Sequence, residues 1–197
     1  MQTCCTDVNL NLKPKTYNLS NVRIIAGHLK GQIIASPHGH KTHPMSERMR
    51  GAMFNTLGDI NGLTCLDAFA GSGSVGIEAI SRGASFVVFI DSDKNANQTI
   101  AQNLVKLKLN NAKNIRANSA SWSKLNSNDK FDLVICDPPY DSINIDNIMQ
   151  LASNVKQGGL FILSAPKDFA RLRIEGFELV ADKSFADGSI IFYKMDK

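Results

Sequence analysis

The chain has 197 residues and a formal net charge of +4, with 43% hydrophobic and 20% charged residues. These values are typical of a soluble globular chain of one domain. No apolar run approaches the length that a membrane span requires, so we expect no membrane association.

The first twenty residues are polar and rich in asparagine, and they lack the apolar core of a signal peptide. We therefore expect residues 1–20 to be a disordered tail, followed by a single domain over residues 21–197. The four cysteines match neither a metal site nor a disulfide framework. Together these features predict a cytoplasmic protein with reduced thiols, in which Cys65 and Cys136 are small core residues.

Basic residues are concentrated at the start of the chain. Residues 1–50 hold seven lysines and arginines but only two acidic residues, together with all four histidines. This distribution indicates either a polyanionic partner, such as nucleic acid, or a solvated tail. Charge alone does not separate the two interpretations.

After the tail, residues 22–26 and 32–35 are expected to form two short strands, joined by a turn at residues 28–31. A loop follows, and then a helix within residues 45–58. Ser46 can cap the start of this helix, and Gly58 can end it.

From residue 64 the pattern alternates between strand and helix. This order predicts a parallel sheet that is covered by helices on both faces. Residues 177–194 instead indicate two antiparallel strands without an intervening helix. The five strands of the alternating part are expected at 64–69, 86–91, 114–117, 132–136 and 160–164, with helices at 74–81, 93–109 and 145–155.

A glycine-rich loop links the first of these strands to its helix, in the segment LDAFAGSGSVGIEAISRGA. Gly71, Gly73 and Gly76 form a G-x-G-x-x-G pattern, and Asp91 follows Gly71 by twenty residues. This spacing satisfies the dinucleotide-binding fingerprint, so an NAD-dependent oxidoreductase is the first hypothesis.

Asp67 favours a different cofactor. Its carboxylate lies at the end of the first strand, where it would repel a diphosphate but attract an ammonium or sulfonium group. S-adenosylmethionine (SAM) carries both cations, has ribose hydroxyls for Asp91 and has no phosphate. We therefore expect SAM at this loop, with NAD and a purely structural tight turn as the alternatives.

The fourth strand ends in Asp-Pro-Pro-Tyr, at residues 137–140. Two prolines can simply terminate a strand. At the carboxyl end of a parallel sheet, however, Asp137 faces the same crevice as Asp67 and Asp91. The Asp137 carboxylate and the rigid Pro138 carbonyl can accept the N–H groups of a planar amine, while Tyr140 stacks on its ring. The motif thus predicts methyl transfer to an exocyclic amine, with no metal.

Four segments occur in the order seen in the RsmD family, and the chain resembles that family from about residue 22 to residue 193. They are VRIIAGHLKGQIIASP, HPMSERMRGAMFNTLG, LDAFAGSGSVGIEAISRGA and CDPPYD. The family comprises bacterial methyltransferases that modify guanine N2 in 16S ribosomal RNA (rRNA). The resemblance implies an α/β fold: a Rossmann-like, mostly parallel seven-stranded sheet with one antiparallel strand, plus a small N-terminal β-hairpin.

The resemblance also implies roles for individual residues. The catalytic clamp would be Asp137, Pro138, Pro139 and Tyr140. SAM would contact Asp67, Phe69, Ala70, Gly71, Gly73, Asp91, Ser92, Ser119 and Ala120. Residues 21–44 and the following helix would contact RNA, through Arg23, Lys30, Lys41, His43 and Arg48.

The chain departs from the family pattern at three places. His43-Pro44-Met45 replaces the usual Arg-Pro-Thr, Ser119 replaces an acidic or amide residue, and Ser164 replaces an acidic one. We predict a monomeric enzyme that methylates guanine N2 of 16S rRNA in the small ribosomal subunit. The alternatives are methylation of another RNA or of DNA, at adenine N6 or cytosine N4, and a non-catalytic RNA-binding assembly factor.

Overall fold

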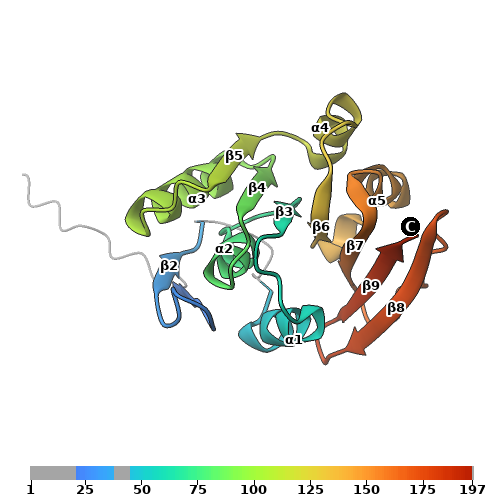
Figure 1. Cartoon of the computed structure of the whole chain (residues 1–197), viewed down its shortest axis with the longest axis horizontal. Coiled ribbons are helices and arrows are strands. Elements are labelled where there is room, and N and C mark those ends of the chain that lie inside the picture. The colour runs from blue at the N-terminus through green and yellow to red at the C-terminus, as the bar shows by residue number, and fades with distance from the viewer. Residues whose placement is uncertain (1–20, 38–44, 197) are drawn as a thin grey trace, which may run out of the picture.

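A computed structural model describes residues 21–37 and 45–196. The predicted tail and the predicted RNA contacts Lys41 and His43 lie outside these ranges. Within them, seven strands form one sheet in the order β5-β4-β3-β6-β7-β9-β8 (Figure 1). The strands are β3 (Thr64–Asp67), β4 (Phe86–Asp91), β5 (Ala112–Arg116), β6 (Phe131–Cys136), β7 (Val155–Ala165), β8 (Phe177–Ser184) and β9 (Ser189–Met195).

The direction of the strands confirms the predicted fold class. Strands β3 to β7 pair in parallel, whereas β9 runs antiparallel to both of its neighbours, β7 and β8. Strand order reverses between β3 and β6, because the chain leaves β3 toward β4 and β5 and later returns to the other side. In such sheets a ligand crevice opens at this reversal, beyond the carboxyl ends of the strands.

Helices cover both faces of the sheet (Figure 1). Strand β4 shows why: Val87 and Phe89 pack with helices α1 to α3, while Val88 and Ile90 pack on the other face with α4 and α5. Successive side chains of a strand point to opposite faces, so a continuous apolar run serves both cores. The helices are α1 (Glu47–Leu57), α2 (Ser74–Ser81), α3 (Lys94–Lys106), α4 (Ser119–Leu125) and α5 (Ile145–Ala152), with a 3₁₀ turn, η1 (Tyr140–Ser142).

Several predicted details are confirmed. Ser46 accepts a hydrogen bond from the Met49 amide and so caps α1, and Gly58 follows its end. Cys65 and Cys136 are fully buried. The predicted alternation omitted α4, and it placed the start of β7 five residues too late. No helix in the described ranges is long and apolar enough to span a bilayer.

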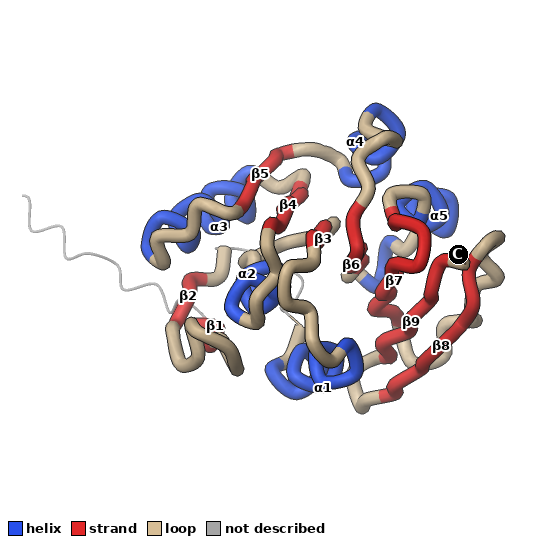
Figure 2. Tube along the Cα trace, in the orientation of Figure 1, coloured by secondary structure: helices blue, strands red, loops and turns tan. Residues whose placement is uncertain are grey.

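The predicted N-terminal hairpin is present as β1 (Asn21–Arg23) and β2 (Ile33–Ala35), shorter than expected. Its turn lies against the end of α2 (Figure 2). The His28 amide donates to the Ser81 carbonyl at 2.8 Å, and the Leu29 amide donates to the Ser81 hydroxyl at 3.0 Å. A Cβ at Gly27 would lie 1.7 Å from the Ser81 carbonyl oxygen, so only glycine allows this contact. The hairpin is therefore fixed to the domain.

Glu78 of α2 adds a buried anchor for the same hairpin. Its carboxylate accepts from the Ile25 amide at 2.8 Å, the Ala26 amide at 3.0 Å and Arg82 Nε at 2.8 Å. Since Glu78 has no exposed surface, these donors replace the water that it loses on burial.

Arg50 of α1 belongs to the same buried cluster. Its side chain is fully buried, and it donates to the carbonyls of Arg23 at 2.7 Å and Met45 at 3.1 Å. Burial lowers its pKa, and the Glu78 carboxylate opposes that shift. Arg50 thus joins α1 to the hairpin.

Asn103 of α3 ties the hairpin to the glycine loop. Its side-chain oxygen accepts from the Ala35 amide at 2.9 Å. Its nitrogen donates to the Ala35 and Ser72 carbonyls, both at 3.0 Å. A single buried amide therefore links β2, α3 and the loop before α2.

Candidate active site

The loop between β3 and α2 is shaped by its glycines. Gly71 and Gly73 have φ of 54° and 78°, in the left-handed region, which lets the chain turn sharply from strand to helix. Gly76, in α2, has a different role. A Cβ there would lie 2.2 Å from the Phe89 ring, so this glycine lets α2 pack tightly on β4.

Backbone amides of this segment bind the two strand-end carboxylates. The Gly76 amide donates to Asp67 Oδ2 at 2.9 Å, and the Gly71 amide donates to Asp91 Oδ2 at 2.8 Å. The other Asp91 oxygen accepts from the Asp93 amide at 2.8 Å. Both carboxylates are therefore oriented by the main chain.

Asp67 is almost completely buried, with 1% of its surface exposed. Its pKa is raised from 3.8 to about 7, chiefly by burial and also by the charges of Asp137 and Asp91, while the hydrogen bond from the Gly76 amide opposes the rise. The strand register agrees with this: Asp67 pairs with Phe89 of β4 and with Ile135 of β6, which lie two residues before Asp91 and Asp137. The three carboxylates therefore stand at the carboxyl ends of three neighbouring strands, as the sequence predicted.

The Asp-Pro-Pro-Tyr segment follows the end of β6. Burial raises the pKa of Asp137 to about 6, and a hydrogen bond from the Ser164 side chain opposes this rise. Tyr140 lies in η1, partly buried, with its hydroxyl 2.7 Å from Ser164 Oγ. In the sequence, Ser164 stands out only as a departure from the family pattern. No local pattern links residues 24 positions apart, so its contact with Tyr140 was not predicted.

Residues near the predicted adenine position lie at the start of α4. The Ser119 hydroxyl is buried and donates to the Ala68 carbonyl. The Asn118 side chain accepts from the Ser121 amide at 3.0 Å and caps the helix. Ser119 therefore joins α4 to the residue that follows β3, while Asn118 orders the start of the helix. The remaining predicted contacts differ in exposure: Ala70 is buried, Phe69 and Ala120 are partly exposed, and Ser92 is exposed.

Three observations indicate that the described residues can bind SAM. A Cβ built at Gly71 meets no atom within 4 Å, so there is open space against the loop. The Ser72 hydroxyl is buried and has no hydrogen-bond partner among the described residues, which leaves a donor for a ligand. Asp67 is a buried carboxylate whose ionised form is disfavoured until a cation approaches.

Three of the predicted RNA contacts fall in the described ranges, and all three are exposed. Arg23 and Lys30 lie in the hairpin, and Arg48 lies on α1. Arg23 Nη2 is paired with Glu47 Oε2 at 2.7 Å, so part of its charge is already balanced.

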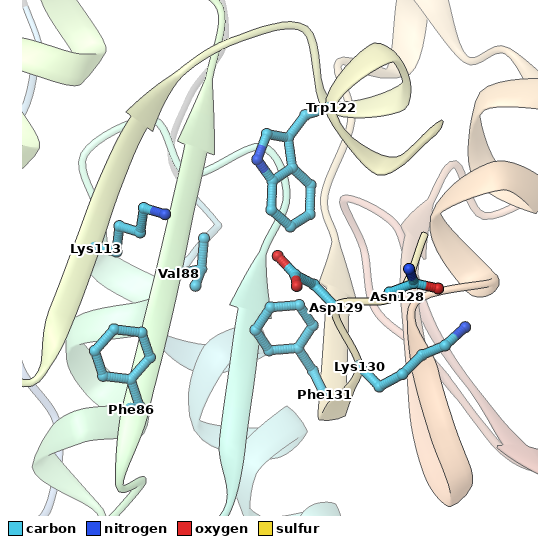
Figure 3. A pocket seen from close by; sticks show the side chains of 8 residues that line it. All are labelled: Phe86, Val88, Lys113, Trp122, Asn128, Asp129, Lys130 and Phe131. Carbon is cyan, nitrogen blue, oxygen red and sulfur yellow. The ribbon is translucent and has the colours of Figure 1, made fainter. Parts of the chain in front are cut away.

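A pocket of about 340 Å³ lies elsewhere (Figure 3). Phe86 and Phe131 on its wall are the first residues of β4 and β6, so the pocket opens toward the amino ends of the strands. Trp122 also lines it; its ring packs against Phe131, and 9% of the residue is exposed. Trp122 is therefore a core residue, and none of the three strand-end carboxylates lines this pocket.

Comparisons with known proteins agree with this site. The family model described as Conserved hypothetical protein 95 matches residues 22–194. Ribosomal RNA small subunit methyltransferase D of Buchnera aphidicola (from Acyrthosiphon pisum) is 36% identical over 138 residues, covering 70% of this chain and 72% of that protein. Its namesake in Haemophilus influenzae is 34% identical over 170 residues, covering 83% and 88%.

The solved structure of the Escherichia coli protein yhhF, a proposed methyltransferase, is also similar. It superposes with a TM-score of 0.81 at 28% identity, covering 89% of this chain and 98% of that one. With the family match over nearly the whole described chain, the resemblance noted in the sequence is confirmed. The chain belongs to the Conserved hypothetical protein 95 family, which is the RsmD family of methyltransferases.

Proposed function

We propose that this protein transfers the methyl group of SAM to the exocyclic N2 amine of a guanine in 16S rRNA of the small ribosomal subunit. One observation carries the proposal. Asp67 of β3 pairs with Ile135 of β6, two residues before Asp137, so the amine clamp and the cofactor loop lie at the same edge of the sheet.

SAM, when bound, supplies an electrophilic methyl group on a sulfonium. We assign its positive methionine end to Asp67, its ribose hydroxyls to Asp91 and its carboxylate to the Ser72 hydroxyl and the loop amides. Asp91 is already oriented by two backbone amides, so little side-chain freedom is lost when it accepts a ribose.

The clamp prepares the nucleophile. The lone pair of an exocyclic amine is delocalised into the base, so the amine is a weak nucleophile. Hydrogen bonds from its N–H groups to the Asp137 carboxylate and the Pro138 carbonyl fix its orientation and increase electron density on nitrogen. The ring of Tyr140 offers the base a flat apolar surface.

Asp137 also fits the role of proton acceptor. Its pKa of about 6 leaves it mainly ionised at neutral pH, while its basicity exceeds that of an ordinary aspartate. The amine becomes much more acidic once it carries the methyl group, so Asp137 can accept its proton. The carboxylate therefore orients the amine first and takes its proton afterwards.

We assign RNA docking to the hairpin and α1. Arg23, Lys30 and Arg48 are exposed there, and the hairpin is fixed to α2, whose preceding loop faces the crevice. This arrangement would hold a phosphate backbone at a set distance from the clamp. A monomer in the cytoplasm, built as one domain over residues 21–197, remains our prediction.

A methyl-transfer assay tests the function directly. Small subunits from cells that lack the modification would be incubated with labelled SAM and the protein, and the digested nucleosides identified by mass spectrometry. N2-methylguanosine at one position is the expected product. Labelling of transfer RNA or DNA instead would contradict the rRNA substrate, and absence of transfer despite SAM binding would contradict an enzyme. Asp141→Ala, at an exposed carboxylate in η1, is the matched control for Asp137→Ala.

A further inference from the structure

Tyr140 is held by contacts outside its own motif. It lies in a short 3₁₀ turn after two prolines, where its ring could adopt several rotamers. Its hydroxyl, however, lies 2.7 Å from the Ser164 hydroxyl, at the carboxyl end of β7. Ser164 is 1% exposed, so water does not compete for this hydrogen bond.

Ser164 lies beside Asp137 because of strand register. Cys136 of β6 pairs with Leu163 of β7, so the next residues on each strand are Asp137 and Ser164. The Ser164 side chain hydrogen-bonds to the Asp137 carboxylate and lowers its pKa. A serine hydroxyl has one proton and two lone pairs. When Ser164 gives this proton to the carboxylate, it can only accept from Tyr140, so the tyrosine hydroxyl is then the donor of the 2.7 Å hydrogen bond.

Gly188 packs against Tyr140 as well. It precedes β9, and a Cβ there would lie 2.4 Å from the Tyr140 hydroxyl oxygen and 3.1 Å from Tyr140 Cε2. The tyrosine therefore occupies space that any other residue at position 188 would fill. Burial raises the pKa of Tyr140, as do the charges of Asp137 and Asp187, so its hydroxyl stays a neutral donor.

We propose that Ser164 is a positioning residue. It accepts a hydrogen bond from the Tyr140 hydroxyl and donates one to the Asp137 carboxylate, and so it fixes the stacking ring relative to that carboxylate. This inference rests on the proposed function and deepens it. In this chain of hydrogen bonds Tyr140 donates to Ser164, and Ser164 donates to Asp137, so each hydroxyl proton has an acceptor. It assigns a role to the tyrosine hydroxyl, beyond the stacking of the ring.

A double-mutant cycle tests the chain in the methyl-transfer assay. We expect Ser164→Ala and Tyr140→Phe each to lower kcat about tenfold, as loss of a hydrogen bond to a charged network does. The double variant should fall no further, because either change breaks the same chain. Kd for SAM should stay within about twofold of the wild-type value, since neither group touches Asp67 or Asp91 in this arrangement. Independent, multiplicative losses would overturn the proposal.

The pH profile separates positioning from a merely structural role. Without the Ser164 donor the Asp137 pKa rises. The acidic limb of the plot of kcat against pH should therefore move to higher pH in Ser164→Ala. Ser85→Ala is the matched control, because Ser85 donates to the Gly62 carbonyl at 2.7 Å near the opposite end of the sheet. An unmoved limb in Ser164→Ala would overturn the proposal.

A measurement that does not depend on methyl transfer separates the test of Ser164 from the test of the proposed function. Carbon-13 NMR of labelled aspartate, in folded protein with SAM bound, reports the Asp137 pKa directly. A higher value in Ser164→Ala than in Ser85→Ala and the wild type supports the inference, even if no RNA is methylated. Equal Asp137 pKa values in all three proteins would overturn it, even if methylation of guanine N2 is demonstrated.

Discussion

The cofactor side and the substrate side of the crevice are held in place by different parts of the chain. On the cofactor side, which comprises Asp67, Asp91 and the glycine loop, backbone amides donate to both carboxylates. On the substrate side, which comprises residues 137–140 and Ser164, the partners of Asp137 and Tyr140 are side-chain hydroxyls. Backbone donors persist under most substitutions, whereas a side-chain donor is lost with one. The cofactor side should therefore tolerate changes among neighbouring side chains better than the substrate side.

The largest expected effect follows from removing the acceptor on the substrate side. Asp137→Ala should lower kcat by about a thousandfold, since it removes both an orienting acceptor and a proton acceptor. Kd for SAM should change little, because the cofactor side keeps its backbone donors. Single-turnover methyl transfer and calorimetry measure the two quantities. A Kd that rises as steeply as kcat falls would mean that the two sides are not separable.

The converse change is Asp67→Asn on the cofactor side. It keeps an oxygen for the Gly76 amide but removes the negative charge that faces the cofactor. Kd for SAM should rise about a hundredfold, which is the scale of a buried charge-assisted contact. Asp91→Asn, at a partly exposed position, is the comparison variant and should have a smaller effect. Calorimetry with S-adenosylhomocysteine, which lacks the sulfonium charge but keeps the ammonium, should show a smaller loss for Asp67→Asn.

A third change tests the packing beneath the cofactor loop. Gly76→Ala places a Cβ about 2.2 Å from the Phe89 ring, so α2 has to move away from β4. The free energy of unfolding should fall by about 2 kcal/mol, as is usual for overpacking. Urea denaturation measures this. Gly71→Ala is the matched control: its Cβ has room, and only its φ of 54° is unfavourable, so about 1 kcal/mol is expected. Equal losses would mean that the contact with Phe89 is relieved at no cost.

The smallest effect, about tenfold per pH unit, concerns protonation of Asp67. Its pKa is about 7 in the cofactor-free protein, and only the ionised carboxylate attracts a cation. Affinity for SAM should therefore rise as pH increases from 6 to 7 and level off above, by about tenfold per unit at most. Asp67→Asn should lose this dependence. A flat profile in the wild type would contradict the raised pKa.

Stability of the cofactor-free protein should change in the opposite sense. Asp67 and Asp137 have folded pKa values of about 7 and 6, above the ordinary 3.8. Between about pH 4 and pH 7 the folded protein binds more protons than the unfolded chain. The stabilisation that the two carboxyl groups provide is therefore largest below about pH 4 and is lost as pH rises to 7. Thermal melts of the wild type against Asp67→Asn isolate the Asp67 part. The cofactor side thus gives up stability at the pH at which it binds best.

Much of the fold could be predicted because its determinants are local. The apolar run of β4 serves two cores, Ser46 caps α1, and Gly71 and Gly73 permit the turn after β3. Asp67 and Asp91 each end a strand and Asp137 directly follows one, and the carboxyl ends of parallel strands meet at one edge. Helix α4 and the early start of β7 were missed, because short polar helices and strands with glycines carry weak periodic signals.

By itself, the sequence determined the strand–helix order, the glycine turn and the identity of the groups that end the strands, since these depend on neighbours a few residues apart. Only the tertiary structure decided which polar groups meet across long separations. Arg50 became a buried link between α1 and the hairpin, and Ser164 became the partner of both Tyr140 and Asp137. The reason is physical: a buried polar group must find a partner wherever the packed elements bring one, and its own segment does not encode that position.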